Sequence, residues 1–330
     1  MNLLELRELS VTYPGNAAHG LFEMPPVFKA LVGVSLTLNQ GEVLSLIGES
    51  GSCKTTLGRA IMGLTPVSRG EIALNGITMT NLRGDSRLPF ARVVQMLFRA
   101  PSGSLRPRQT IGQTLREPLI IHASVPRGVH TARVNTLLDR VGQTANHARR
   151  DPAQFSDCQR QRIAIARAIA NDPALLIADV SVIALDVSLQ AQILNLLDDL
   201  RREQNLAKLF ISHDLSVVQH LCDRIAVMHL GRIVEIATTE QISARPAHSY
   251  STAPLSAAPR FHARDKKAAP IILQGDVPSH AAIPPGCAFH IRCWLYQAKG
   301  KPTRCHPEKP ALTSLPDGRQ TACFFPGQIG

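Results

Sequence analysis

The chain has 330 residues, and 44% of them are apolar, which is ample material for a packed core in one large or two smaller domains. It carries 36 Lys plus Arg against 25 Asp plus Glu, and the net charge of +11 suits either nucleic acid or the anionic inner face of a membrane. Residues 1–15 have no basic region followed by an apolar one, and no later window reaches the roughly 18 unbroken apolar residues of a spanning helix. We therefore expect a globular, cytoplasmic protein.

Strands are expected first along the chain. LLELRELSVTY (3–13) and the run from Phe28 to Gly48 read as strands, and the second run ends in the apolar VLSLI (43–47). The loop GESGSCKTT (48–56) follows, with a helix predicted from about residue 55. Strand, loop and helix in this order are typical of the phosphate-binding pattern G-x-x-x-x-G-K-S/T, in which Cys53 here replaces the second glycine.

The middle of the chain is predicted to contain an inserted helical subdomain at about 96–165, where polar helical segments are interrupted by prolines. Two apolar runs then follow, ALLIAD (174–179) and AKLFISHD (207–214), separated by an amphipathic helix at 188–204. This alternation predicts an α/β core with a parallel sheet. After about residue 258 the composition shifts to Pro, His, Lys and Arg, which indicates a separate appendage.

A phosphate loop with one altered glycine is a modest signal by itself, because a glycine-rich turn after a strand is often only a turn. Its companions make it specific. In chain order they are Tyr13, LFRAP (97–101), FSDCQRQRIAIARAI (155–169), LLIADV (175–180), ALD (184–186) and FISHD (210–214).

With these motifs the chain resembles, over nearly its whole length, the ATP-binding subunits of ABC transporters, in the oligopeptide, dipeptide and nickel importer branch. The branch is indicated by GSLRPRQTIGQ (103–113), ISHDLSVV (211–218), AHSY (247–250) and PPGCAFHIRC (284–293). The resemblance implies an α/β, RecA-like P-loop NTPase fold: an ABC nucleotide-binding domain at 1–258, which includes the helical subdomain, and a Cys-rich C-terminal extension at 259–330.

The resemblance also implies the ATP site. Adenine would stack on Tyr13, Lys54 would reach the β- and γ-phosphates, and His213 would contact the γ-phosphate. Thr55 and Asp179 would hold Mg²⁺. The implied nucleotide-binding positions are Tyr13, Gly48, Ser50, Gly51, Ser52, Lys54, Thr55, Thr56 and Asp179, with Ser156 and Gln159 acting on the nucleotide of a partner subunit. Read singly, Tyr13 is also compatible with a plain strand residue, Asp179 with a strand-end cap and His213 with a turn residue.

Several positions depart from the family pattern. Cys53 fills space that the family leaves for phosphate. If the backbone there is left-handed, a residue with a Cβ atom also carries a conformational cost of about 1–2 kcal/mol relative to glycine. Arg99 replaces a glutamine that helps to hold Mg²⁺ and the attacking water. Val180 replaces the glutamate that polarises this water, and loss of a positioned general base typically removes about 10²–10⁴ in rate.

The signature motif LSGGQ of the family is FSDCQ in this chain, so Asp157 and Cys158 replace two glycines that face the partner's γ-phosphate. A carboxylate there repels a triphosphate. ABC ATPases act as head-to-tail dimers in which each nucleotide lies between one phosphate loop and the other subunit's signature. With either partner, neither composite site would be intact, and we expect weak MgATP binding with impaired or absent hydrolysis.

Four of the seven cysteines, Cys287, Cys293, Cys305 and Cys323, lie in the last 44 residues, separated by five, eleven and seventeen residues. Four cytosolic thiols in a polar tail indicate loops that are cross-linked by Zn²⁺ or an iron–sulfur centre, although four unligated thiols are the plainer alternative. The resemblance implies a four-iron four-sulfur cluster. Cys222 is expected to be simple core.

The function expected from the resemblance is energy coupling in a peptide importer. The implied partners are a second ABC ATPase in a homo- or heterodimer, two permease subunits and an extracytoplasmic substrate-binding protein, at the cytoplasmic face of the cell membrane. The alternative is a catalytically silent scaffold, or a decayed or altered copy of a working subunit. Pro254, inside a predicted helix, and Ala237, in place of a turn glycine, favour decay. A nucleic-acid ATPase suits the positive charge, but the chain has neither a second cassette nor a coiled-coil insert, so no nucleic-acid partner is expected.

Overall fold

The computed structural model describes residues 2–15, 27–98, 105–179, 187–212, 215–257, 271 and 273–328. The chain divides into two compact units. Unit 1 comprises residues 39–42 and 82–210, and unit 2 comprises residues 2–38, 43–81 and 211–330.

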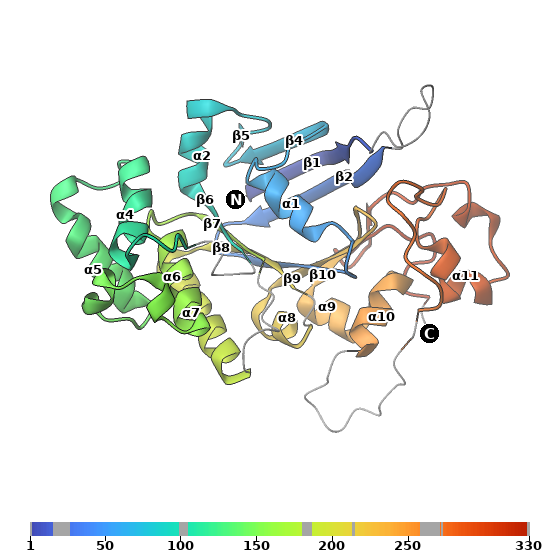
Figure 1. Ribbon diagram of the computed structural model, residues 1–330. Coiled ribbons are helices and arrows are strands. Elements are labelled where there is room, and N and C mark those ends of the chain that lie inside the picture. The colour runs from blue at the N-terminus through green and yellow to red at the C-terminus, as the bar shows by residue number, and fades with distance from the viewer. Residues whose placement is uncertain are drawn as a thin grey trace. The chain divides into compact units, whose positions relative to one another are not determined.

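The elements follow one another along the chain as in Figure 1. The strands are β1 (Asn2–Tyr13), β2 (Phe28–Asn39), β3 (Val43–Ile47), β4 (Arg69–Leu74), β5 (Ile77–Thr78), β6 (Val94–Leu97), β7 (Leu175–Asp179), β8 (Ala207–Ile211), β9 (Arg224–His229), β10 (Arg232–Thr238), β11 (Thr313–Ser314) and β12 (Gln320–Thr321). The α-helices are α1 (Lys54–Ile61), α2 (Leu88–Val93), α4 (Ile111–Ile121), α5 (His130–Arg140), α6 (Asp157–Ala168), α7 (Val187–Gln204), α8 (Leu215–Leu221), α9 (Thr239–Ala244), α10 (Ser249–Ala257) and α11 (Trp294–Ala298).

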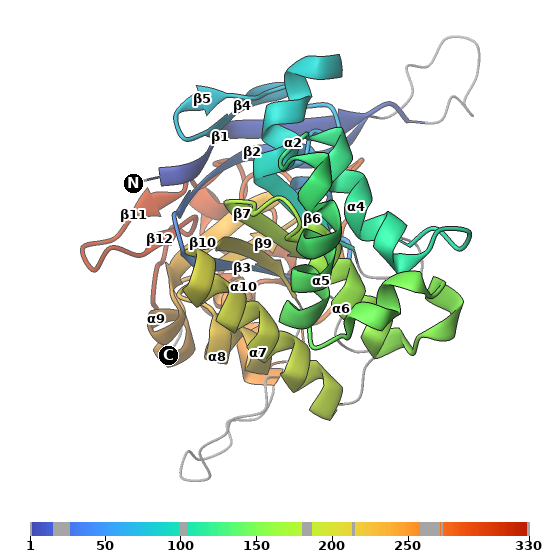
Figure 2. The ribbon, with the colours of Figure 1, turned by 90° about the vertical axis from the view of Figure 1, so that its left-hand side faces the viewer.

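Unit 2 is built on β-structure. One sheet has the order β2-β1-β4-β5, and the strands of unit 2 in the other sheet have the order β11-β12-β10-β9-β3. β3 runs parallel to β9, and β10 is antiparallel to both β9 and β12. Figure 2 shows β11 and β12, in red, beside β10, and α8, α9 and α10 on the side of β9 and β10 that faces away from β1. The C-terminal extension therefore continues a sheet of the nucleotide-binding domain.

The strands predicted at the start of the chain are confirmed as β1, β2 and β3. Every residue of β3 is buried, as expected for a continuous apolar run in a parallel pair. The predicted helix begins at Lys54, one residue earlier than expected. Gly63, with φ +64°, follows the end of α1 and gives the backbone the left-handed turn that commonly ends a helix.

Unit 1 contains the predicted helical segment, in which α4, α5 and α6 pack against one another (Figure 1). The strands of this unit have the order β8-β7-β6, with β6 parallel to β7. The βαβ alternation predicted for residues 174–214 is present as β7, α7 and β8. Thr110 caps α4 by accepting a hydrogen bond from the Gln113 N–H at 3.3 Å.

Two minor predictions have opposite outcomes. Pro254 lies inside α10, as expected. Ala237, in contrast, is not in a turn: it lies in β10 opposite Ile225, where extended backbone suits any residue. The interpretation of Ala237 as damage to a turn was wrong.

Candidate functional site

The phosphate loop connects β3 to α1 in unit 2. A Cβ atom added to Gly48 would lie 2.1 Å from the carbonyl oxygen of Met228, so the loop needs glycine where it leaves the strand. The loop then turns back on itself, with the Ser52 N–H donating to the Glu49 carbonyl at 3.1 Å. These features give the first part of GESGSCKTT the compact turn that a phosphate-binding loop requires.

Cys53 adopts left-handed backbone geometry, with φ 69° and ψ 28°. It occupies the position before the first residue of α1, and its side chain makes no capping hydrogen bond to the helix. Left-handed geometry costs a residue with a Cβ atom about 1–2 kcal/mol relative to glycine. Strain was expected at Cys53 if its backbone is left-handed, and the backbone is left-handed.

Lys54 is buried, and its ammonium group is enclosed by the loop. Its Nζ donates to the carbonyl oxygens of Gly48 and Glu49 at 2.7 and 2.9 Å and to Ser52 Oγ at 3.0 Å. These oxygens occupy the donors that the phosphates of ATP would take. For the expected contact with phosphate, the side chain would have to exchange these oxygens for phosphate oxygens.

Rings extend from Tyr13 towards the loop. Tyr13, 38% exposed at the end of β1, has its ring centroid 6.2 Å from that of Phe28, and Phe28 lies 4.9 Å from His280. The His280 Nε2 atom lies 2.6 Å from the Gly51 carbonyl oxygen. Tyr13 is thus connected to the phosphate loop through the rings of Phe28 and His280.

His280 links the loop to β2 through its two ring nitrogens. Nδ1 lies 2.9 Å from the Lys29 carbonyl oxygen, and Nε2 faces the Gly51 carbonyl and, at 3.6 Å, Cys53 Sγ. Only the doubly protonated ring can donate to a carbonyl at each nitrogen. The hydrogen bond with Cys53, together with those to the two carbonyls, raises the pKa of His280 to about 9.

The remaining described residues of the predicted nucleotide site lie in unit 1. Asp179 ends β7 and is buried. Ser156 and Gln159 form a capping box at the start of α6: Ser156 Oγ accepts from the Gln159 N–H at 3.3 Å, and Gln159 Oε1 accepts from the Ser156 N–H at 3.0 Å. The Asp157 carboxylate is exposed and pairs with Arg160 at 2.7 Å. The signature segment therefore presents a helix N-terminus that carries a carboxylate.

The four C-terminal cysteines line one small cavity of about 20 Å³ in unit 2. Burial raises the pKa of Cys287 to about 12 and that of Cys323 to about 11, so both thiols hold their protons unless a cation replaces them. Among the described residues, no group of three or more His, Cys, Asp or Glu is arranged closely enough to hold a metal ion. The donor set suits a thiolate-bound metal, and the thiols would have to move inwards to bind it.

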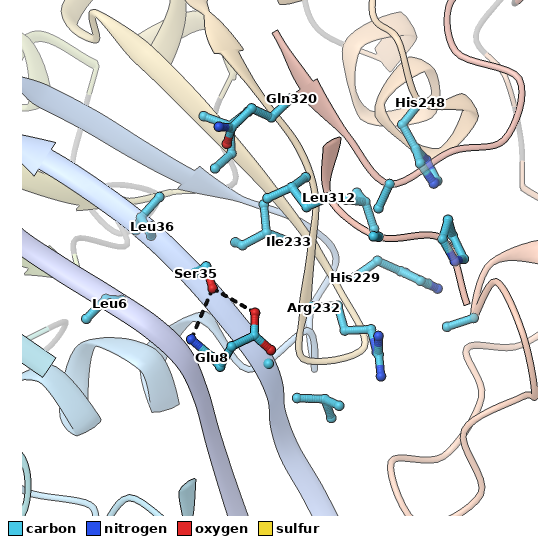
Figure 3. A pocket seen from close by; sticks show the side chains of 18 of the residues that line it. Leu6, Glu8, Ser35, Leu36, His229, Arg232, Ile233, His248, Leu312 and Gln320 are labelled. Atoms are coloured by element: carbon cyan, nitrogen blue, oxygen red, sulfur yellow. Dashed lines mark hydrogen bonds between the residues drawn. The ribbon is translucent and has the colours of Figure 1, made fainter. Parts of the chain in front are cut away.

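A larger cavity of about 680 Å³ lies elsewhere in unit 2, among β1, β2, β10 and the extension (Figure 3). In it, Ser35 on β2 donates to Glu8 Oε1 at 3.0 Å and accepts from the Glu8 N–H at 3.0 Å. Figure 3 shows His229 and Arg232 on the opposite side of this space. None of the predicted nucleotide-binding residues lines the cavity, so it is separate from the phosphate loop.

Sequence analysis missed several residues that contact the loop. The Arg292 guanidinium pairs with the Glu49 carboxylate at 2.8 Å, and the Tyr250 hydroxyl accepts from the Glu49 N–H at 2.8 Å. AHSY and PPGCAFHIRC contain Tyr250 and Arg292, and both motifs were used only to identify the branch. The expected roles of Arg99, Val180 and His213 fall outside the described residues.

The comparisons with known proteins agree with this geometry. The family model for ABC transporters matches residues 31–181, and the model for the C-terminal region of oligopeptide/dipeptide transporters matches residues 234–299. The ATP-binding cassette MJ0796, solved as a dimer bound to ADP and Pi, is 27% identical with a TM-score of 0.63, over 72% of this chain and 98% of that one. The predicted α/β ABC nucleotide-binding fold is confirmed.

Two full-length relatives identify the branch. The dipeptide transport ATP-binding protein DppF of Haemophilus influenzae is 42% identical over 98% of this chain and 96% of its own length. The oligopeptide transport ATP-binding protein AppF of Bacillus subtilis is 42% identical over 88% of this chain and 89% of its own length. In the described part of the chain, no helix combines the length and apolarity needed to cross a membrane. The chain belongs to the family of ABC transporter ATP-binding proteins, in its oligopeptide/dipeptide branch.

Proposed function

We propose that this protein is the energy-coupling subunit of a peptide importer, and that it binds MgATP weakly and hydrolyses it poorly or not at all. Its relatives are named for dipeptide and oligopeptide transport. The proposed assembly has a second ABC ATPase, two permease subunits and an extracytoplasmic binding protein, with this chain at the cytoplasmic face of the membrane. The 259–330 extension is proposed as a structural appendage of the nucleotide-binding domain.

The proposed nucleotide site uses Tyr13 for adenine and the backbone N–H groups of residues 48–55 for the phosphates. Lys54 would transfer from its loop carbonyls to the β- and γ-phosphates, while Thr55 and Asp179 would hold Mg²⁺. His213 is assigned to the γ-phosphate. Cys53 is the observation that carries weak binding, because it places a side chain, on left-handed backbone, where a glycine would let phosphate approach closely.

Poor hydrolysis is inferred from three substitutions. Val180 cannot accept a proton from the attacking water, and Arg99 brings a cation where the family has a neutral ligand. Asp157 would face the partner's nucleotide with a carboxylate that, in the described part of the chain, pairs with Arg160 on its own helix. The same substitutions support the second candidate, a silent scaffold or an altered copy of a working subunit.

We also propose that Cys287, Cys293, Cys305 and Cys323 together hold a metal centre, either a four-iron four-sulfur cluster or Zn²⁺. Their convergence on one cavity supports this assignment. Such a centre would supply cross-links between loops in place of a larger core. Metal analysis of protein purified without oxygen distinguishes the two: about four irons per chain with visible absorption indicates the cluster, and one zinc per chain indicates a tetrahedral site.

The decisive experiment compares MgATP binding and ATPase turnover before and after repair. We expect a dissociation constant in the millimolar range and negligible turnover for the natural chain in the assembled transporter. Restoring glycine at 53, 157 and 158 and glutamate at 180 should raise turnover by at least about 100-fold. Vanadate-sensitive turnover by the unrepaired chain would refute the impairment, and no thermal shift with millimolar MgATP would favour the silent scaffold.

A further inference from the structure

Two residues from the C-terminal part of the chain contact the phosphate loop at Glu49: Arg292 in the extension, and Tyr250 shortly before it. The Arg292 guanidinium donates to both carboxylate oxygens, from Nη1 to Oε2 at 2.8 Å and from Nη2 to Oε1 at 3.0 Å. Tyr250, in α10, accepts a hydrogen bond from the Glu49 N–H at 2.8 Å. Glu49 is therefore held through both its side chain and its main chain by residues about 200 positions or more away in sequence.

The ion pair is well shielded on the arginine side. The Arg292 side chain is 6% exposed and that of Glu49 is 32% exposed. A two-point guanidinium–carboxylate pair fixes the orientation of both groups, and it is stronger when partly removed from water. The carboxylate has little freedom to rotate, and the loop backbone that bears it is restrained in turn.

A further contact fixes the loop beyond Ser50. His280, from the residues that precede α11, donates from Nε2 to the Gly51 carbonyl oxygen at 2.6 Å. The extension thus holds the residues on both sides of Ser50, in the stretch whose N–H groups are proposed to bind phosphate.

The same residues adjoin the cysteine cavity. Arg292 immediately precedes Cys293, and Cys293 Sγ lies 3.1 Å from the hydroxyl of Ser249, the neighbour of Tyr250. Cys293, Ser249 and the other three cysteines line the 20 Å³ cavity. A displacement of Cys293 therefore reaches Glu49 by two short routes, through Arg292 and through Tyr250.

We propose that Arg292 is a positioning residue of the phosphate loop: by fixing Glu49 together with Tyr250, it makes the affinity of the loop for MgATP depend on the order of the four-cysteine segment. The identity of the ligand rests on the proposed function. The Glu49 side chain has no assigned contact with ATP, and the effect passes through the loop backbone, which must present its N–H groups in one arrangement. Tyr250 restrains the same residue from the other side.

The test uses the full-length chain and two measurements. Hydrogen exchange, followed on the peptide that covers residues 48–53, reports the order of the loop, and equilibrium dialysis with labelled MgATP reports affinity. Arg292→Gln should speed exchange in that peptide and raise the dissociation constant about tenfold. The matched control is Arg304→Gln. Arg304 also directly precedes one of the four cysteines, Cys305, but it pairs with Glu308 in solvent: the two side chains are 62% and 56% exposed. This control should change neither measurement.

A double-mutant cycle separates positioning from general damage. Glu49→Gln removes the same ion pair from its more exposed side, so it remains informative if Arg292→Gln fails to fold. The effects of the two substitutions on loop exchange should not add, whereas Arg292→Lys should recover part of the affinity. Cys293→Ser should speed exchange in the same loop peptide.

Additive effects, or loop exchange in Arg292→Gln and Glu49→Gln equal to that of the Arg304→Gln control, would overturn the proposal. If the natural chain binds no MgATP, the proposed function fails, and the exchange measurements still decide whether the extension positions the loop.

Discussion

Cys53 Sγ lies 3.6 Å from Nε2 of His280, although the two residues are 227 positions apart in the chain. The contact joins a cysteine in the phosphate loop to a histidine of the C-terminal extension. It gives the side chain at this left-handed position a polar partner. The energetic effect of Cys53 is therefore the sum of two opposing contributions: backbone strain, which destabilises the loop, and the contact with His280, which stabilises it.

Two substitutions at position 53 separate these contributions. Cys53→Ala keeps the Cβ atom in left-handed geometry and loses the contact with His280, whereas Cys53→Gly relieves the backbone as well. We expect the free energy of unfolding of Cys53→Gly to exceed that of Cys53→Ala by about 1 kcal/mol, measured by urea denaturation. Cys53→Gly should also bind MgATP more tightly than the natural chain. Equal stabilities for the two variants would show that the left-handed backbone at Cys53 carries no strain.

The protonation of His280 predicts a loss of stability in alkali. Its pKa is raised to about 9 in the folded chain, from an ordinary value near 6.5, so the folded state binds the proton more tightly than the unfolded state. This contribution is fully present below about pH 6.5 and is lost as the pH rises through about 9. Between these limits the natural chain should lose about 1–3 kcal/mol more stability than His280→Gln.

Urea unfolding at intervals of half a pH unit checks this prediction. Every other ionisable group is common to both proteins, so the difference between the two curves isolates the contribution of His280. Parallel curves from pH 6.5 to 9 would mean that the ring is neutral in the folded chain.

Local sequence patterns predicted most of the fold. β3 and β7 are short, continuous apolar runs, and such runs indicate buried parallel strands wherever they occur. The start of α1 followed from the loop pattern, and α4, α5 and α6 lie within the segment predicted to be helical. Ala237 was misjudged because a family turn was transferred to a position that in this chain pairs in a strand.

The contacts of the extension could not be predicted in the same way. Glu49 and Arg292 are 243 positions apart, and neither residue carries a local pattern that names its partner. Each residue belongs to a recognised motif, but a motif does not indicate which distant residues its members contact in the folded chain. The left-handed backbone at Cys53 was, in contrast, foreseeable, since it is the reason for a glycine at that position.

The exposed ring of Tyr13 predicts a base-stacking contribution to affinity. Tyr13→Ala should weaken ATP binding by about 1–2 kcal/mol, or roughly tenfold, because the stacking face is removed. Tyr13→Phe should bind as the natural chain does, since a stacking platform needs no hydroxyl. The affinity for inorganic triphosphate, which has no base, should be the same in all three proteins. If Tyr13→Ala weakens the binding of triphosphate as strongly as that of ATP, the residue supports the loop and does not stack on adenine.

The buried ring of His229 predicts sensitivity to acid. The ring is 2% exposed, and its centroid lies 4.5 Å from that of the Tyr250 ring. Its Nε2 atom has no hydrogen-bond partner in the described structure. Burial is the main cause that lowers the pKa of His229 to about 3, and the nearby positive charge of Arg292 lowers it further in the same direction. Below about pH 6.5 His229 binds a proton in the unfolded chain but not in the folded chain. The free energy of unfolding therefore falls progressively as the pH falls towards 3.

His229→Phe keeps an aromatic ring against Tyr250 and removes the titrating group. Between pH 7 and pH 5 the natural chain should lose about 2 kcal/mol more stability than this variant, measured by urea unfolding at each pH. His220→Gln, which removes an exposed imidazole from α8, is the control and should follow the natural chain. If the pH dependence of His229→Phe equals that of the natural chain, His229 can bind a proton in the folded state. Its Nε2 atom then has a hydrogen-bond partner in solution.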